Sequence, residues 1–134
     1  MSQKKAKAAR RVERLKVWKI DLKKYAVEVQ GKDEKGNIKP MKTSFDVKES
    51  LASILFIADL RLGIDEAFKA KELADKIRKA GEHVLLDNAE MDRLRASYNV
   101  SKGPAEHELE FFRRIRDAVE VEAAEVVEEE EPSK

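Results

Sequence analysis

The chain contains no cysteine. Disulfides, thiolate catalysis and zinc sites built from cysteine are therefore excluded, and the composition fits a reducing compartment. No apolar run approaches the roughly 20 residues of a membrane-spanning helix, because Asp59 and Arg61 interrupt the cluster between Leu51 and Leu62. The basic N-terminus lacks a following apolar segment, so it is not typical of a secretory signal. These absences predict a cytoplasmic protein with no membrane partner.

Catalytic motifs are missing as well. The five glycines are scattered singly and form no phosphate-binding loop, and the serines show no nucleophile-elbow pattern. His83 and His107 lack metal-ligand spacing, and Asp87 with Glu90 is explained by helix capping. The sequence therefore argues against an enzyme and predicts no cofactor and no bound metal. An unrecognised hydrolase, with His83 and a carboxylate in an apolar pocket, is the remaining enzymatic hypothesis.

The charge is abundant but unevenly distributed. The 134 residues are 41% charged and carry a net charge of only +1. Residues 1–24 hold ten Lys/Arg against two acids, a net charge of +8, whereas residues 105–134 hold eleven acids against four Lys/Arg, a net charge of −7. We predict a disordered basic arm at residues 1–14, one domain at residues 15–119 and a disordered acidic tail at residues 120–134. The tail could fold back on the arm or keep the protein soluble.

An alternation of apolar and polar residues predicts strands near the N-terminus. It runs from Leu15 to Gln30 with a change of phase at Lys23–Lys24, which indicates a bulge or a break. The polar stretch from Gly31 to Asn37 predicts a turn, and a second strand follows from Ile38 to Phe45. Pro40 cannot donate a ladder hydrogen bond, so we expect this strand at a sheet edge. The resulting β-hairpin must pack on other elements to be stable.

The rest of the chain has helical periodicity. Asp46 is expected to cap a largely buried helix that ends at about Leu62, before Gly63. Asp65 is expected to cap the next helix, which Gly81 ends. The inner faces of these two helices are predicted to contain Val47, Leu51, Ile54, Leu55 and Ala58 in the first, and Phe68, Leu73, Ala74 and Ile77 in the second.

Two further helices complete the pattern. The run His83–Leu86 is a short strand or an extended connector, and Asp87 opens a helix to about Tyr98. Pro104 begins the last helix, in which Leu109, Phe112, Ile115 and Val119 form the apolar face. The predicted fold is α+β, an N-terminal β-hairpin packed on a bundle of about four helices.

Two groups of residues are candidates for binding. Lysines and arginines near the N-terminus are interleaved with Trp18 and Tyr25, a combination that single-stranded nucleic-acid surfaces use. Both aromatics also fall on the strand alternation, for which burial is the commoner explanation. On the last helix, Phe111 lies off the apolar face beside Arg113 and Arg114, which suggests partner docking, with core packing as the alternative. The basic candidates are Lys7, Arg10, Arg11, Arg14, Lys16 and Lys19.

After the hairpin come three stretches in a fixed order. They are Ser50-Leu-Ala-Ser-Ile-Leu-Phe, Ala70-Lys-Glu-Leu-Ala-Asp-Lys-Ile and Val84-Leu-Leu-Asp-Asn-Ala-Glu-Met-Asp-Arg-Leu. With the final amphipathic helix, this order resembles small accessory or assembly proteins of tailed phages and prophages, over about Leu15 to Val119. The resemblance implies a protein that binds other proteins and brings no catalytic residues with it.

These patterns favour a non-enzymatic accessory or adaptor protein that acts by binding another protein. The resemblance further implies a phage-encoded assembly or regulatory factor that works in the host cytoplasm. The alternative is a nucleic-acid-binding accessory protein that uses the basic arm. A homo-oligomer formed through an exposed edge strand is a further expectation.

Overall fold

The computed structural model describes the backbone of residues 10–128 and the side chains of residues 16–123. Its strands are β1 (Arg10–Asp21), β2 (Tyr25–Lys32), β3 (Ile38–Phe45), β4 (His83–Leu86) and β5 (Val119–Glu128). Its α-helices are α1 (Val47–Ile54), α2 (Ile64–Lys79), α3 (Asn88–Val100) and α4 (Leu109–Arg116), with short 3-10 helices η2 (Ala58–Leu60) and η3 (Glu106–Glu108). The predicted α+β class is confirmed.

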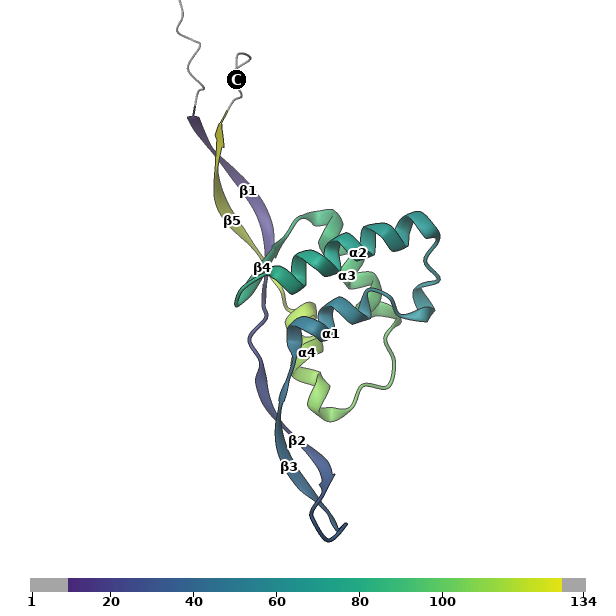
Figure 1. Ribbon diagram of the computed structural model, residues 1–134. Helices are drawn as coiled ribbons and strands as arrows, with labels where there is room; N and C mark the ends of the chain where they lie inside the picture. The colour runs from purple at the N-terminus through teal and green to yellow at the C-terminus, as the bar shows by residue number, and fades with distance from the viewer. Residues whose placement is uncertain (1–9, 129–134) are drawn as a thin grey trace, which may run out of the picture.

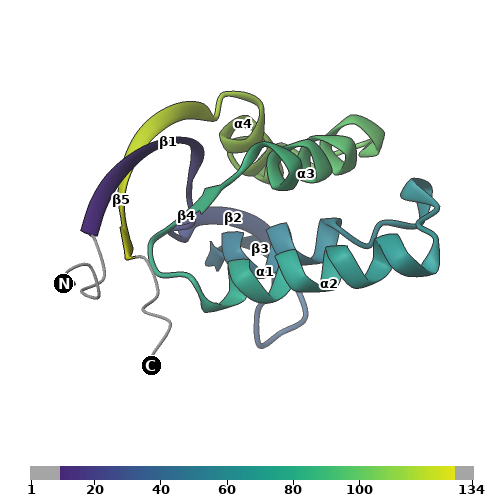
Figure 2. The same ribbon diagram turned by 90° about the horizontal axis from the view of Figure 1, so that it is seen from above.

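The helices form a central body from which two β-ribbons project in opposite directions (Figure 1). One sheet has the strand order β4-β1-β5, and the other is the hairpin β2-β3. Seen from above, α1 lies beside α2 and α3 beside α4, with β1, β4 and β5 at one end of these helices (Figure 2).

Residues 10–14 and 120–128 belong to strands, although the charge pattern places them in a disordered arm and a disordered tail. Residues 10–14 belong to β1 and residues 120–128 to β5, and the two strands pair antiparallel from Arg10↔Glu128 to Lys19↔Val119. The prediction is wrong because it considered each charged segment separately and did not consider that the two segments could pair with each other. The pairing sets basic β1 against acidic β5, and β-branched residues such as Val17 and Val121 fall opposite one another. The remainder of the predicted arm and tail, residues 1–9 and 129–134, lies outside the described residues.

The predicted hairpin is confirmed, and the change of phase before it is a break. β1 ends at Asp21, and its last four residues, from Trp18 onward, pair with β4 in the three-stranded sheet. Leu22 is buried at the break, where its N–H donates to the carbonyl of Glu82 at 2.8 Å. β2 then pairs with β3 from Tyr25↔Phe45 to Lys32↔Ile38. Gly36 closes the turn with a φ of +84°, a conformation that glycine adopts without steric cost.

The first two helices differ from their predicted limits. Asp46 caps α1 as expected, but α1 ends at Ile54 and the chain turns through η2 before α2. The predicted continuous helix to Leu62 is wrong because the chain reverses there to pack α2 against α1. Gly63, not Asp65, precedes the first turn of α2, and Ala80 ends it.

The core lies where the helices meet β1 and β4. Leu51 and Leu55 of α1, Ala74 and Ile77 of α2 and Leu86 of β4 are all fully buried. The small buried side chains of Ala70 and Ala74 let α1 and α2 approach closely. The capping box of α3 is also confirmed, with Asp87 and Glu90 bonded reciprocally at 2.7 and 2.9 Å.

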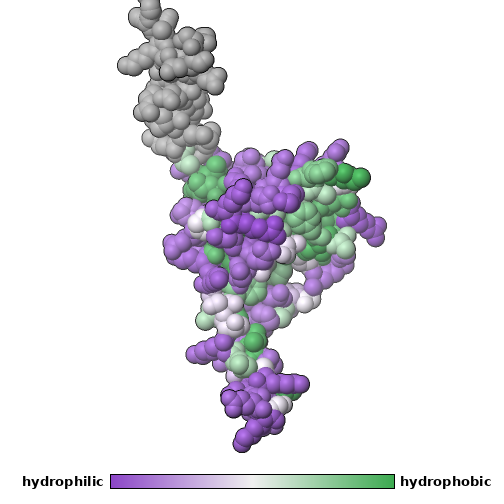
Figure 3. Space-filling model, in the orientation of Figure 1, coloured by the Kyte–Doolittle hydropathy of each residue, from purple (hydrophilic) through white to green (hydrophobic). Residues whose placement is uncertain are grey.

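Four predicted inner residues are instead exposed, and the first of them is Ala58, which lies in η2 and not on a continuation of α1. Phe68 of α2 is 66% exposed, Leu109 of α4 is 53% exposed, and Val119 is 60% exposed because α4 ends before it. Phe68 and Ile64 lie one turn apart near the start of α2, where apolar surface gathers in Figure 3. Phe111 takes the buried place on α4.

Candidate protein-binding site

Five of the six basic residues predicted from the sequence lie on β1, which pairs with β5, and two of them, Arg10 and Lys16, are opposite glutamates. Arg10, Arg11 and Arg14 are backbone positions of β1 paired with β5, and Lys16 and Lys19 have exposed side chains. β1 carries five Lys/Arg and two acids, and β5 carries four glutamates, so the ribbon has a net charge of −1. The strand pairing therefore offsets the positive charge on which nucleic-acid binding would depend. Lys7 lies outside the described residues.

The aromatic residues of the same region have partners inside the chain. The indole N–H of Trp18 donates to Oδ1 of Asn88 at 2.8 Å, and the guanidinium of Arg95 lies 4.4 Å from the centroid of its ring. Tyr25 is half-buried at the base of the hairpin. Both aromatic residues are half-buried and have partners within the chain, which agrees with the structural alternative that the sequence left open.

The three candidates on α4 are not arranged as a docking surface. Phe111 is 2% exposed, so the prediction that it lies off the buried face is wrong. The side chain of Arg114 is 13% exposed and pairs with Glu110 at 2.8 Å. Arg113 is the exposed member, and its Nε also donates to Glu110, at 2.9 Å. The difference arises because α4 is rotated to bury Phe111 and Ile115 on one side.

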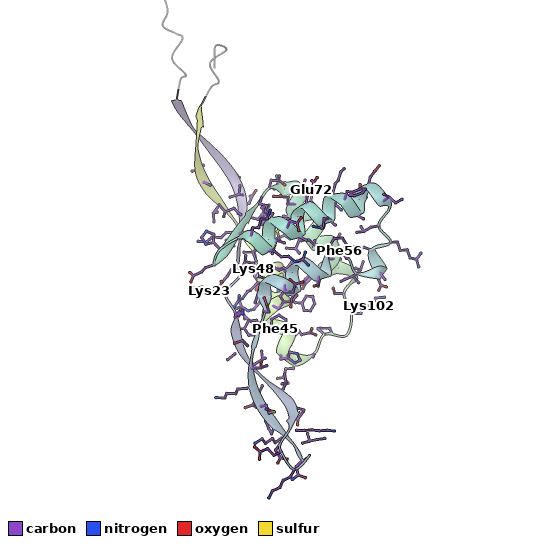
Figure 4. All side chains as sticks on the ribbon, viewed as in Figure 1. Lys23, Phe45, Lys48, Phe56, Glu72 and Lys102 are labelled. Carbon is purple, nitrogen blue, oxygen red and sulfur yellow. The ribbon has the colours of Figure 1, made fainter. Side chains whose placement is uncertain are left out.

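A cluster that we call the hairpin base joins β2 and β3 to α4. It consists of Tyr25, Phe45, His107, Phe111 and Arg114. The Tyr25 ring stacks on Phe45 with centroids 5.0 Å apart, and Phe45 meets Phe111 at 5.4 Å. Phe45 lies where the hairpin meets the helical body (Figure 4). These contacts fix the direction in which the hairpin leaves the body.

Polar contacts add to the hairpin base. The Tyr25 hydroxyl donates to the carbonyl of His107 at 2.9 Å and accepts from the N–H of Phe111 at 3.1 Å. Burial raises the pKa of Tyr25 above its ordinary value of 10.0, against opposing effects of the Phe111 N–H and Arg114. The neutral phenol is therefore the form that fits this site.

Replacing Tyr25 with phenylalanine should lower the free energy of unfolding by about 1–2 kcal/mol, because it removes both hydrogen bonds and retains the stacked ring. Urea denaturation of the variant measures this loss. Replacement of Tyr98, which meets Phe112 edge-on and for which no hydroxyl hydrogen bond is recorded within residues 10–128, is the matched control. Equal losses in the two variants would contradict the assigned role of the Tyr25 hydroxyl.

A groove runs along the outer edge of β2. It has a volume of about 710 Å³ and lies between β2 and the η3–α4 segment. Glu28, Glu106 and Glu110 provide its charged side chains, and no lysine or arginine lines it in the part of the chain that the structure describes. Its lining consists of Tyr25, Ala26, Val27, Glu28, Val29, Gln30, Glu106, His107 and Glu110.

The hydrogen-bond pattern of the hairpin leaves alternate residues of β2 open to this groove. The N–H of Asp33 donates to the carbonyl of Asn37 at 2.9 Å, and bonded pairs alternate along an antiparallel ladder. Odd-numbered residues of β2 therefore bond to β3, whereas Ala26, Glu28 and Gln30 direct their N–H and C=O groups outward. The same alternation places Pro40 at an outward position of β3, where its missing donor costs no ladder bond.

Glu110 is the one groove carboxylate with recorded ionic partners. Hydrogen bonds from Arg114 and then Arg113 lower its pKa below the ordinary value of 4.5. Glu28 and Glu106 are exposed, and no ion pair is recorded for either within the described chain. The groove thus offers two carboxylates that are free to meet a cation.

One feature of the sequence indicates this site indirectly: Pro40 predicts that the hairpin has an open sheet edge. The groove residues themselves were not predicted, because Glu28 and Glu106 are far apart in the chain and come close together only when α4 packs.

Residues 10–128 contain no cluster of three or more potential metal ligands, and none of their helices is long and apolar enough to cross a membrane. Comparisons with protein-family models, curated proteins and solved structures found no match.

Proposed function

We propose that this protein is a non-enzymatic accessory or adaptor protein that acts by binding another protein. The observation that carries the proposal is the β2–β3 hairpin, which projects from the body while its base is fixed by aromatic packing. Ile38 and Met41 on β3 are 69% and 42% exposed. A two-stranded hairpin of this kind is marginally stable alone, and open edges and apolar side chains of this type are typical of protein-binding surfaces.

Nucleic-acid binding has less support. It was predicted from an isolated basic arm, and the pairing of β1 with acidic β5 leaves that ribbon with a net charge of −1. The phage origin suggested by the sequence resemblance stays a prediction.

Site-specific photo-crosslinking in cells that express the protein tests the proposal. A photoreactive residue at position 38 on the hairpin should give discrete protein adducts that survive nuclease treatment. Position 68 is the matched control, because Phe68 is similarly apolar and 66% exposed but lies on α2.

Adducts at position 68 alone would move the binding surface to α2 and contradict the assignment to the hairpin. Adducts that nuclease removes, or no adduct at either position, would contradict protein binding as the function.

A further inference from the structure

We propose that the groove beside β2 accepts an extended, basic segment of the partner protein as a third strand of the hairpin sheet. This inference rests on the proposed function and assigns to it a site and a class of ligand. The occupant is a segment in which lysine or arginine alternates with apolar residues.

The backbone supports strand addition at β2. Ala26, Glu28 and Gln30 direct N–H and C=O groups to the outer edge, and no backbone hydrogen bond from this edge to another element is recorded within residues 10–128. Main-chain hydrogen bonds to such an edge are the source of affinity when an extended peptide joins a sheet. A third strand would also relieve the marginal stability of a two-stranded sheet.

The two edges of the hairpin are not equivalent. The outer edge of β3 contains Pro40, which has no N–H to offer, and Lys39 and Lys42 lie on the same strand. Proline and lysine on an edge strand hinder the addition of another strand. β2 carries no proline, and the η3–α4 segment gives its groove a second wall. An added strand is therefore expected to pair with β2 and not with β3.

The charge of the groove selects the kind of segment. Glu28 projects from β2 and Glu106 from η3, and the third carboxylate, Glu110, is already paired with arginines. No lysine or arginine among the described residues lines the groove. Lysines or arginines of the incoming strand would pair with Glu28 and Glu106, whereas an acidic segment would be repelled.

The full-length protein should be titrated against a labelled nine-residue peptide in which lysine and valine alternate, and against the peptide with glutamate in place of lysine. Fluorescence anisotropy should show that the lysine peptide binds at least tenfold more tightly. The double variant Glu28→Lys with Glu106→Lys should remove most of this preference, and Glu34→Lys with Glu72→Lys, two exposed acids outside the groove, is the matched control.

Amide hydrogen exchange by NMR then tests whether the peptide is added as a strand. Saturating peptide should slow exchange at Ala26, Glu28 and Gln30 by about tenfold or more, whereas Lys42 and Ser44 on the opposite edge should be unchanged. Substitution Gln30→Pro removes one outward donor and should weaken binding by about tenfold, the effect of roughly one hydrogen bond.

Each other result would overturn the inference. Equal binding of the two peptides, or no binding, would reject the basic ligand, and binding without slowed exchange at β2 would reject strand addition. Slowed exchange at the same amides without peptide, together with concentration-dependent dimers in sedimentation, would assign the groove to a second copy of the chain. Crosslinks at position 38 that persist while peptide binding fails would retain the proposed function and reject only this site.

Discussion

Replacing Phe111 with alanine is expected to lower the free energy of unfolding by about 3–5 kcal/mol, the usual cost of removing a buried phenylalanine. Phe111 is 2% exposed and its ring lies 5.4 Å from Phe45 and 5.0 Å from Phe112. The cavity would lie between the hairpin and α4, so both would be loosened together. Urea denaturation followed by circular dichroism measures the change.

Leu109 provides the control for this prediction. It lies two residues earlier on α4 but is 53% exposed, so alanine there should change stability by less than about 1 kcal/mol. A larger loss at Leu109 than at Phe111 would contradict the observed rotation of α4 and restore the apolar face predicted from the sequence.

Replacing Arg114 with methionine should cost about 1.5–3 kcal/mol, because it removes the hydrogen bonds that its largely buried guanidinium donates to the chain between β1 and β2. Its Nη1 donates to the carbonyls of Asp21 at 3.1 Å and Lys23 at 2.7 Å, and its guanidinium lies 5.2 Å from the Tyr25 ring centroid. Arg114 thus holds the break between β1 and β2 against α4. Thermal and urea unfolding of the variant measure the loss.

Arg113 provides the control for the Arg114 prediction. It is adjacent in the chain and also pairs with Glu110, but its side chain is 54% exposed, so its replacement with methionine should cost less than about 1 kcal/mol. If the Arg114 variant unfolded like the wild type yet lost partner binding, Arg114 would be a docking residue, as the sequence suggested, and its structural role would be wrong.

Local signals in the sequence predicted local structure well. The caps at Asp46 and Asp87, the turn before Ile38 and the change of phase at Lys23–Lys24 each depend on a few neighbouring residues, and each corresponds to an observed feature. Such features depend on backbone conformation and short-range hydrogen bonds. Both can be predicted from the residue types at a few neighbouring positions.

Features that depend on distant packing were missed. The partner of Arg10 is Glu128, and nothing near either residue indicates the other. The end of α1 at Ile54 and the exposure of Phe68 follow from how α2 folds back on α1. The candidate groove has the same origin, because its walls come from β2 and from η3–α4, which meet only after α4 packs on the hairpin base.

The pairing of β1 with β5 has a consequence for the order of folding. β1 contacts β4 along residues Trp18 to Asp21, whereas within residues 10–128 the strand partner of Arg10 to Val17 is β5 alone. Closing that part of the sheet requires β1 and β5 to meet across a very long loop, which costs more chain entropy than any local step. During synthesis β5 leaves the ribosome after the helices and the other strands of the described chain. The helical body and the hairpin can therefore form first, and β1 gains its long partner only after β5 has been made.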